Sequence, residues 1–131
     1  MNMKEEYVPD FWGDCKIISQ LELKIVADIL SKNIFGGIPF IYGEHSIWEE
    51  VPSMYIDSNI FGLLVIIGGY GGSQGYDINV QIYGNFNRYL FSNRIKTSRF
   101  KLDMYLYYLL KEGLKDYPEM EAIEPKKNDE F

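Results

Sequence analysis

Residues 61–83 combine two apolar segments with a glycine-rich segment between them, and no other part of the chain restricts the fold as much. The first segment, 61–67, is apolar at almost every position, which indicates a strand covered on both faces. The second, 76–83, alternates apolar and polar residues, as a strand with one buried face does. Five glycines lie between them, and glycine readily adopts the positive φ angles of tight turns. We therefore predict an antiparallel hairpin at the centre of a sheet.

Helical patterns occur on both sides of this hairpin. Ser19 and Glu22 have the spacing of a capping box, which predicts a helix over residues 20–32 with Ser19 as its N-cap. Ser98 is predicted to cap a second helix over 99–112 that ends at Gly113. That helix is apolar or aromatic around most of its circumference, which predicts that it is buried on several sides. The burial is expected either on the sheet or in an oligomer contact.

The remaining segments complete one domain over residues 1–131. Residues 1–18 are interpreted as an irregular arm interrupted by Pro9 and Gly13, and 118–131 as a charged, partly mobile tail. Short strands are predicted at 38–42, where a proline indicates an edge, at 53–57 and at 88–91. The order predicts an α+β fold of two layers, with an antiparallel sheet of about four to five strands packed with an N-terminal and a C-terminal helix.

The composition favours an ordinary intracellular domain. Cys15 is the only cysteine, so neither an internal disulfide nor a cysteine-based zinc cluster can form. No apolar run approaches the roughly 20 residues that a membrane helix needs, and the N-terminus lacks the apolar segment of a signal peptide. We therefore expect a cytoplasmic protein without a membrane segment.

Catalytic and cofactor motifs are not apparent. The glycine-rich segment leads into an alternating strand, whereas a phosphate-binding loop leads directly into a helix. His45 is the only histidine, which disfavours both a metal site and a histidine-dependent nucleophile. The prediction is a non-enzymatic protein with no cofactor and no bound metal.

Charge is distributed unevenly along the chain. The net charge is −6, but seven basic and two acidic side chains give residues 84–115 a net charge of +5, and the remainder carries −11. The predominantly acidic surface favours a basic partner over nucleic acid. The basic segment keeps a nucleic-acid alternative open, because its cations alternate with aromatic residues. These cations are Arg88, Arg94, Lys96, Arg99 and Lys101.

An acidic segment with an aromatic residue inside it is the candidate binding site. No basic residue occurs between Lys32 and Arg88. An aromatic anchor ringed by carboxylates suits an interface with a basic protein, since the ring supplies buried area and the carboxylates steer association. The alternative is an ordinary acidic loop with the tryptophan folded inward. The predicted partner-binding residues are Glu44, Trp48, Glu49, Glu50 and Asp57.

Residues 48–52, the 61–83 hairpin and the aromatic helix at 100–110 occur together in an acidic domain of this size. In this combination the chain resembles the small immunity proteins that bacteria encode beside secreted polymorphic or contact-dependent toxins. The resemblance implies a non-enzymatic binder that neutralises a cognate toxin, often by covering a basic active site. Other classes stay open: a structural or adaptor subunit whose second helix forms a homodimer contact, a small-ligand-binding domain, and an enzyme.

Overall fold

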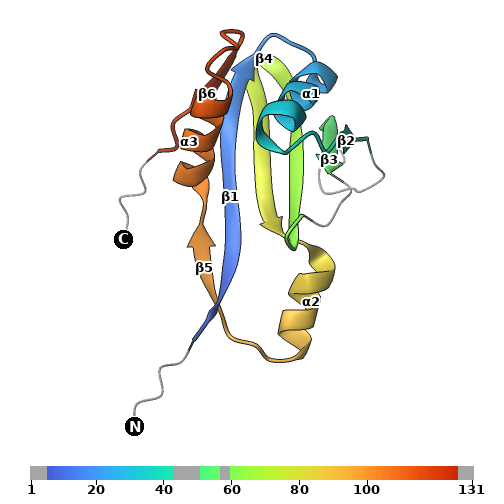
Figure 1. The fold of residues 1–131 in the computed structure, drawn as a ribbon, viewed down its shortest axis with the longest axis vertical. Helices are drawn as coiled ribbons and strands as arrows, with labels where there is room; N and C mark the ends of the chain where they lie inside the picture. Colours follow the sequence, from blue (N-terminus) through green and yellow to red (C-terminus); the bar gives the residue numbers. More distant parts are fainter. Residues whose placement is uncertain (1–5, 43–50, 57–59, 127–131) are drawn as a thin grey trace.

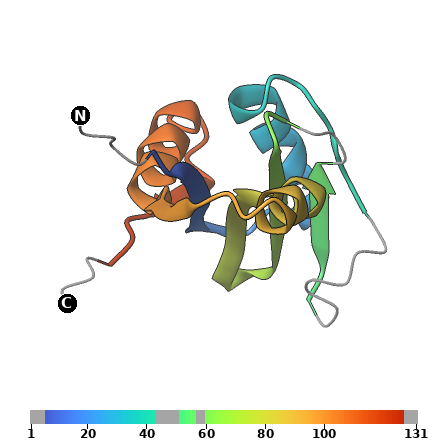
Figure 2. The same cartoon turned by 90° about the horizontal axis from the view of Figure 1, so that it is seen from below.

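The computed structural model describes residues 6–42, 51–56 and 60–126. They form two layers, in which two helices cover one face of a curled sheet and a third helix lies at its end (Figures 1 and 2). The α+β class predicted from the sequence is confirmed. The elements in chain order are β1 (Val8–Ser19), α1 (Leu23–Ile34), β2 (Phe40–Ile41), β3 (Ser53–Ile56), β4 (Leu63–Ile82), α2 (Gly84–Ser92), β5 (Thr97–Lys101), α3 (Asp103–Gly113) and β6 (Met120–Ile123).

The central hairpin is present and is contained within β4. Figure 1 shows β4 running along the sheet, turning at its glycine-rich middle and returning beside itself. The amide of Tyr83 donates a hydrogen bond of 2.8 Å to the carbonyl of Gly62, which joins the two ends of the hairpin. Gly69, Gly71, Gly72 and Gly75 all have positive φ angles, the conformation for which glycine was expected there.

The strand order places β4 at the middle of the sheet. β2 and β3 lie on one side of it, and β1 pairs antiparallel with its second arm. The far edge of β1 is shared, since β5 pairs parallel with its first half and β6 pairs antiparallel with its second half. β2 is an edge strand, as the proline before it indicated.

The predicted alternation in the second arm of β4 determines which face of the sheet is buried. Ile78 and Val80 are buried, at 0% and 5% exposure, against helix residues such as Val26 and Leu30. Asp77 and Gln81 point to the other side of the sheet and are partly exposed. The register predicted from the period-2 pattern is therefore correct.

Within the chain only one stripe of α3 is buried, so the prediction that the sheet buries this helix on several sides is wrong, whereas its burial in an oligomer contact stays a prediction. Leu106 and Leu110 pack into the core, whereas Tyr105 and Tyr108 are 66% and 59% exposed. α3 packs on β1 and against the end of α1, with Tyr105 and Tyr108 outside this contact and Tyr107 partly buried against the core. The helix consequently presents a tyrosine face.

The irregular arm predicted for residues 1–18 is also wrong from Val8 onward, because these residues form β1. Pro9 and Gly13 were interpreted as interruptions, yet each is accommodated. Pro9 lies near the strand end, where a missing amide is tolerated. A Cβ on Gly13 would lie 2.8 Å from that of Leu102, so glycine allows the start of α3 to lie against β1.

Ser19 does not cap the first helix. It is the last residue of β1, and α1 begins at Leu23 with Glu22 in the N-cap position and no side-chain cap. The Ser19 hydroxyl accepts a hydrogen bond of 3.1 Å from the amide of Leu21 in the connecting turn. The helix predicted here exists, but its start lies three residues later than the capping pattern indicated.

Three further assignments differ from the sequence predictions. The strand predicted at 88–91 lies within α2. Ser98 lies inside β5, so it caps no helix, and α3 begins at Asp103. The tail predicted from residue 118 contains β6, which is held to β1. None of the described helices combines the length and apolarity needed to span a membrane.

Candidate interaction surface

All five partner-binding residues predicted from the sequence lie outside the described residues. Glu44, Trp48, Glu49 and Glu50 belong to 43–50, and Asp57 belongs to 57–59. His45 lies in the same unassigned range. The structure does describe Val51, the residue that follows Glu50, and Val51 borders a polar hollow in the sheet.

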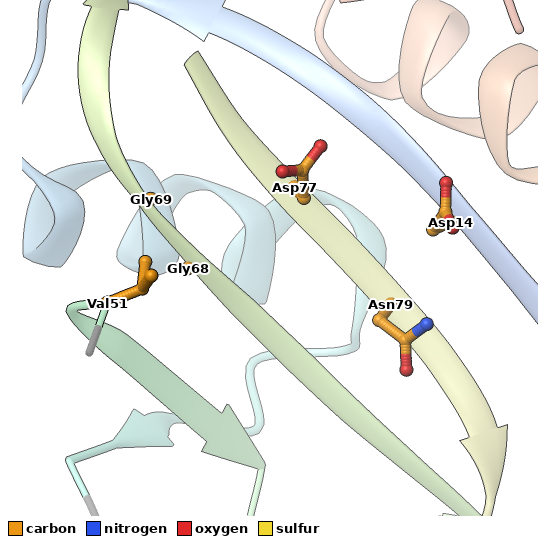
Figure 3. Close-up of a pocket in the computed structure, with 6 residues that line it drawn as sticks. All are labelled: Asp14, Val51, Gly68, Gly69, Asp77 and Asn79. Carbon is orange, nitrogen blue, oxygen red and sulfur yellow. The ribbon is translucent and has the colours of Figure 1, made fainter. Parts of the chain in front are cut away.

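This polar hollow lies on the face of the sheet opposite α1 (Figure 3). Its volume is about 440 Å³. Gly68 and Gly69 have no side chains to fill the surface of β4, so the sheet is concave there, and polar side chains from β1 and the second arm of β4 border the concavity. The lining residues are Asp14, Val51, Gly68, Gly69, Asp77 and Asn79.

Strand pairing brings the polar residues of the hollow together. Asp14 of β1 lies opposite Asn79 of β4, and Lys16 lies opposite Asp77. These side chains share one face because residues two apart in a strand point the same way. The sequence contained the alternation in β4, but the contribution of Asp14 was missed because β1 was not recognised as a strand.

Asp14 is the least compensated carboxylate of the hollow. Its side chain makes no hydrogen bond or ion pair with the described residues. The main-chain amide of Asp14 donates a hydrogen bond of 3.1 Å to a carboxylate oxygen of Asp103. Burial raises the pKa of the Asp14 carboxyl, and the carboxylates of Asp103 and Asp77 raise it further, against smaller opposing effects of Lys101 and Lys16. A cation placed in the hollow would therefore relieve an existing repulsion.

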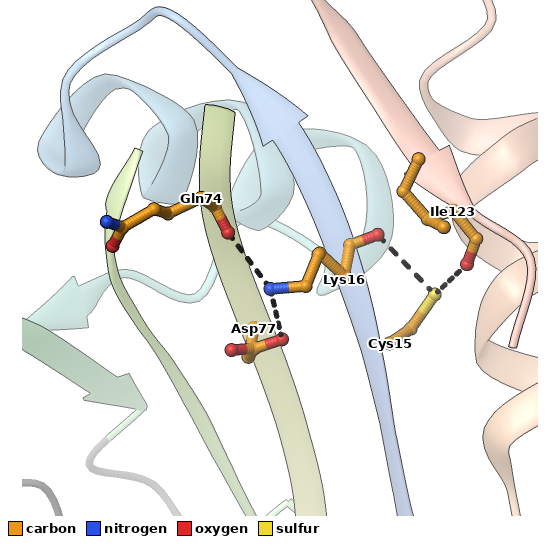
Figure 4. Close-up of polar contacts among 5 residues, drawn as sticks. All are labelled: Cys15, Lys16, Gln74, Asp77 and Ile123. Carbon is orange, nitrogen blue, oxygen red and sulfur yellow. Dashed lines mark hydrogen bonds and ion pairs between the residues drawn. The ribbon is translucent and has the colours of Figure 1, made fainter. Parts of the chain in front are cut away.

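Asp77 is compensated within the chain (Figure 4). Lys16 lies 3.4 Å from an Asp77 carboxylate oxygen and donates a hydrogen bond of 2.9 Å to the carbonyl of Gln74. Both partners of this ion pair are about half exposed, so the pair is screened by water and contributes little to stability. Asp77 is consequently able to exchange its lysine for a cation supplied by another molecule.

Cys15 points to the other face of the sheet, between β1 and β6. Its thiol donates to the carbonyl of Ile123 at 3.4 Å (Figure 4). Burial raises the pKa of Cys15 to about 11, and the carboxylates of Asp14 and Asp103 add to this effect. The thiol is therefore protonated at neutral pH and is a poor nucleophile.

An Asp14→Asn variant is expected to be slightly more stable than the wild type at pH 7. The raised pKa means that the ionised carboxylate opposes folding at every pH above it. The gain should be under about 1 kcal/mol, because the group is partly exposed to solvent. It should shrink as the pH falls through the raised pKa, where the wild-type carboxyl becomes protonated in the folded state.

Urea unfolding at pH 7 and at about pH 3 measures this difference. Asp77→Asn is the matched control and should give a smaller gain, because it relieves only the repulsion with Asp14 and loses the ion pair with Lys16. An Asp14→Asn variant that is less stable than the wild type at pH 7 would show that the carboxylate has a favourable partner.

A second surface, which we term the aromatic groove, lies at the α2 end of the sheet. Here the sheet extends past α1 and α3 toward α2 (Figure 1). The cavity has a volume of about 380 Å³ and an almost wholly apolar lining. Its lining residues are Val8, Pro9, Phe11, Phe61, Gly62, Leu63, Ile82 and Phe86.

Sequence reasoning missed the aromatic groove because residues 84–91 were interpreted as a turn and a strand. The signal was present in the spacing of Phe86, Tyr89 and Leu90, which share one helical face. In the structure Leu90 is buried, and the ring of Phe86 stacks on that of Tyr89 with centroids 6.4 Å apart.

The basic segment is divided between paired and unpaired cations. Arg99 lies 3.6 Å from Asp10 and 5.6 Å from the ring centroid of Trp12, and Lys101 lies 3.9 Å from Asp103. Arg88 and Arg94 have no ion pair with the described residues. The five cations considered for nucleic acid therefore do not form one continuous unpaired stripe.

Comparison with known proteins identifies no relative. No protein-family model matches the chain, and neither a curated protein nor a solved structure is significantly similar to it. The functional argument therefore depends on the residues and the geometry described above.

Proposed function

We propose that this protein is a non-enzymatic immunity protein that neutralises a cognate bacterial toxin by binding a basic surface of it. The proposed contact uses the polar hollow together with the acidic residues that the sequence contains in 43–50 and 57–59. The proposed contact residues beyond the hollow are Glu44, Trp48, Glu49, Glu50 and Asp57.

The observation that carries this proposal is the carboxylate of Asp14, which makes no hydrogen bond or ion pair with the described residues. It lies in a hollow bordered by Val51, and Val51 directly follows the acidic segment in the chain. A lysine or arginine side chain of the partner would enter the hollow and pair with Asp14, while neighbouring carboxylates steer the approach. The arrangement requires no movement of the sheet.

The chemistry of the described residues supports binding rather than catalysis. Among them, no three His, Cys, Asp or Glu side chains are grouped so that they could hold a metal ion. Cys15, the strongest nucleophile available, is held protonated and points into the core. A binding role in the cytoplasm, where an immunity protein meets its toxin, is compatible with both features.

The test is co-expression with the products of the two genes that flank the gene for this protein. The proposal predicts that one of these products arrests growth, that this protein relieves the arrest, and that the two proteins form a stable complex. If neither product forms a complex with it, the immunity function is excluded.

The complex also allows the binding surface to be tested by charge removal. A triple Glu44→Gln, Glu49→Gln, Glu50→Gln variant is expected to associate more slowly and with a weaker salt dependence. Asp14→Asn is expected to weaken binding about tenfold, as loss of one well-placed charge contact does, and Trp48→Ala should speed dissociation. Glu121→Gln on β6 is the control. Protection that survives removal of all these groups would place the interface elsewhere.

One observation favours a second candidate, a structural or adaptor subunit that forms a homodimer. The exposed tyrosine face of α3 contains Met104, Tyr105 and Tyr108, which are 39%, 66% and 59% exposed. Exposed contiguous aromatic side chains are common at protein interfaces. Native mass spectrometry distinguishes the two candidates, because the subunit hypothesis requires a dimer in the absence of any partner.

A further inference from the structure

β5 is the last strand on its side of the sheet, and its outer edge pairs with no described strand (Figure 1). Its inner edge pairs parallel with β1. All five residues of β5 are exposed. An unpaired strand edge presents main-chain donors and acceptors that another extended chain can bind. The outer edge of β5 is therefore a candidate binding surface.

Hydrogen bonds at the two ends of the pairing determine which main-chain groups of β5 face outward. At the first end the amide of Val8 donates to the carbonyl of Lys96 at 2.9 Å, and at the other the amide of Leu102 donates to the carbonyl of Trp12 at 2.8 Å. Successive residues of a strand direct their main-chain groups to opposite edges, so the even-numbered residues from 96 to 102 face β1. The residues whose amide and carbonyl groups face outward are Thr97, Arg99 and Lys101.

These outward groups have no main-chain partner among the described residues. A molecule that pairs with them needs alternating donors and acceptors along an extended chain about 4.8 Å from β5. A helix has already bonded its own main-chain groups internally. A phosphodiester backbone offers acceptors without alternating donors. The edge itself therefore selects an added β-strand as its occupant.

The side chains on one face of β5 favour an acidic strand. Arg99 and Lys101 share this face, and their side chains are 64% and 54% exposed. The acids that pair with them lie on the inner side of β5. Asp10 belongs to β1, and Asp103 accepts a hydrogen bond from the amide of Asp14, also in β1. A strand at the outer edge would consequently approach the cations from the side away from these carboxylates, and acidic residues opposite them would be stabilising.

The other face of β5 favours an apolar residue. It carries Phe100, which is 56% exposed. The ring of Phe100 packs edge-on against that of Phe11 in β1, with centroids 5.8 Å apart. Aromatic and β-branched residues opposite such a ring stabilise a strand pair. The edge therefore specifies a partner sequence in which acidic and apolar residues alternate.

We propose that the outer edge of β5 binds an extended segment of a second protein as an added antiparallel strand. Acidic residues of the segment lie opposite Arg99 and Lys101, and an apolar residue lies opposite Phe100. The antiparallel direction follows from its greater stability per residue. This edge is separate from the polar hollow and has the opposite charge preference, so the inference does not depend on the immunity function.

A second copy of β5 is a poorer occupant of this edge. An antiparallel pair of β5 strands centred on Arg99 would place this cation opposite the same cation of the other copy. A pair centred on Phe100 would place Arg99 opposite Lys101 twice. Like charges directly opposite each other destabilise a strand pair, so the charge of β5 disfavours self-association through its edge.

Selection from a phage-displayed library of random twelve-residue peptides on the immobilised full-length chain provides the probe. We expect the enriched peptides to contain Asp or Glu alternating with β-branched or aromatic residues. Synthetic peptides of these sequences are then N-methylated either at the acidic residues or at the apolar residues. In the proposed antiparallel pairing the amides of the acidic residues face β5, so only the first modification should weaken binding, by about tenfold or more.

Two substitutions at one position separate charge from main-chain pairing. Arg99→Gln and Arg99→Pro remove the same charge, but only proline also removes the outward amide. Arg99→Gln should weaken peptide binding more at low salt than at high salt. Arg99→Pro should weaken it by about a further tenfold, because hydrogen bonds to the edge are lost.

Folding of the variants is checked by circular dichroism and thermal unfolding. Arg99→Pro should keep the fold, because an edge strand tolerates proline where the amide faces solvent. Ser98→Pro should lower the melting temperature much more, because the amide of Ser98 faces β1. Lys24→Gln on α1, which removes a cation paired with Asp28, is the charge control and should leave peptide affinity unchanged.

Several results would overturn this inference. They are the absence of enriched peptides, the enrichment of basic peptides, equal affinity of the two N-methylated forms, and equal affinity for Arg99→Pro and Arg99→Gln. Failure of every peptide to bind would mean that the cations of β5 only protect its edge from pairing. A dimer in sedimentation that Arg99→Pro dissociates would assign the edge to self-association.

Discussion

A Val80→Asp variant is expected to lose its cooperative fold. Val80 is 5% exposed and lies on the helix-covered face of β4, within the hydrophobic core. A carboxylate at this position would be buried without a partner, which costs several kcal/mol. The free energy of unfolding of an entire domain is only about 5–15 kcal/mol, so one such charge is sufficient to unfold the chain or leave it marginally folded. Circular dichroism during urea unfolding measures the loss.

The adjacent position supplies the control for Val80→Asp. Gln81 points to the other face of the sheet and is partly exposed, so Gln81→Asp should change the free energy of unfolding by less than about 1 kcal/mol. The two variants add the same charge one residue apart. A Val80→Asp protein that unfolds cooperatively with wild-type stability would mean that the register of β4 is reversed.

Gly75→Ala is expected to destabilise the domain by about 2–4 kcal/mol, because two separate costs add at this position. The φ angle of Gly75 is +72°, which strains any residue with a Cβ. That Cβ would also lie 2.7 Å from the carbonyl oxygen of Ile17 and 2.8 Å from a side-chain carbon of Ile18. The carbonyl belongs to β1, so relief would require β1 and β4 to separate.

Gly72→Ala separates the conformational cost from the steric one. Gly72 has a similar φ angle of +60°, but a Cβ there would have only ordinary contact, 3.9 Å from a side-chain oxygen of Gln20. The expected loss is about 1 kcal/mol, from the backbone alone. Equal losses for Gly72→Ala and Gly75→Ala in urea unfolding would show that close approach of β1 is not the reason for glycine at position 75.

The hairpin and its buried face could be predicted from the sequence because both depend on short-range properties. The alternation from Tyr76 to Ile82 is a direct consequence of strand geometry, and the glycines are required by local φ angles. The helix in the region of α1 was predicted for a similar reason, since its apolar residues recur at helical spacing. The S-x-x-E pattern failed because Ser19 is held in β1 by pairing with Met120 and Gly72.

Elements whose conformation depends on distant partners could not be predicted. β1 contains a proline and a glycine that interrupt a strand when considered locally, yet it pairs with β4, β5 and β6. Residues 84–101 are rich in aromatics, which occur in both helices and strands, so composition there did not separate α2 from β5. The exposure of the α3 tyrosines likewise depends on how little of α3 the rest of the chain covers.

The two candidate surfaces also combine features that are visible in the sequence with features that only the fold creates. The acidic residues from Glu44 to Asp57 and the basic residues from Arg88 to Lys101 were visible in the sequence as charge. Only the pairing of β1 with β4 brings Asp14 near Asp77, and only the position of α2 beside the 60–63 turn places Phe86 next to Phe61. Charge and periodicity are properties of neighbouring residues, so the sequence determined them. A hollow or a groove is a property of residues that meet through tertiary contacts, and the tertiary structure decided both.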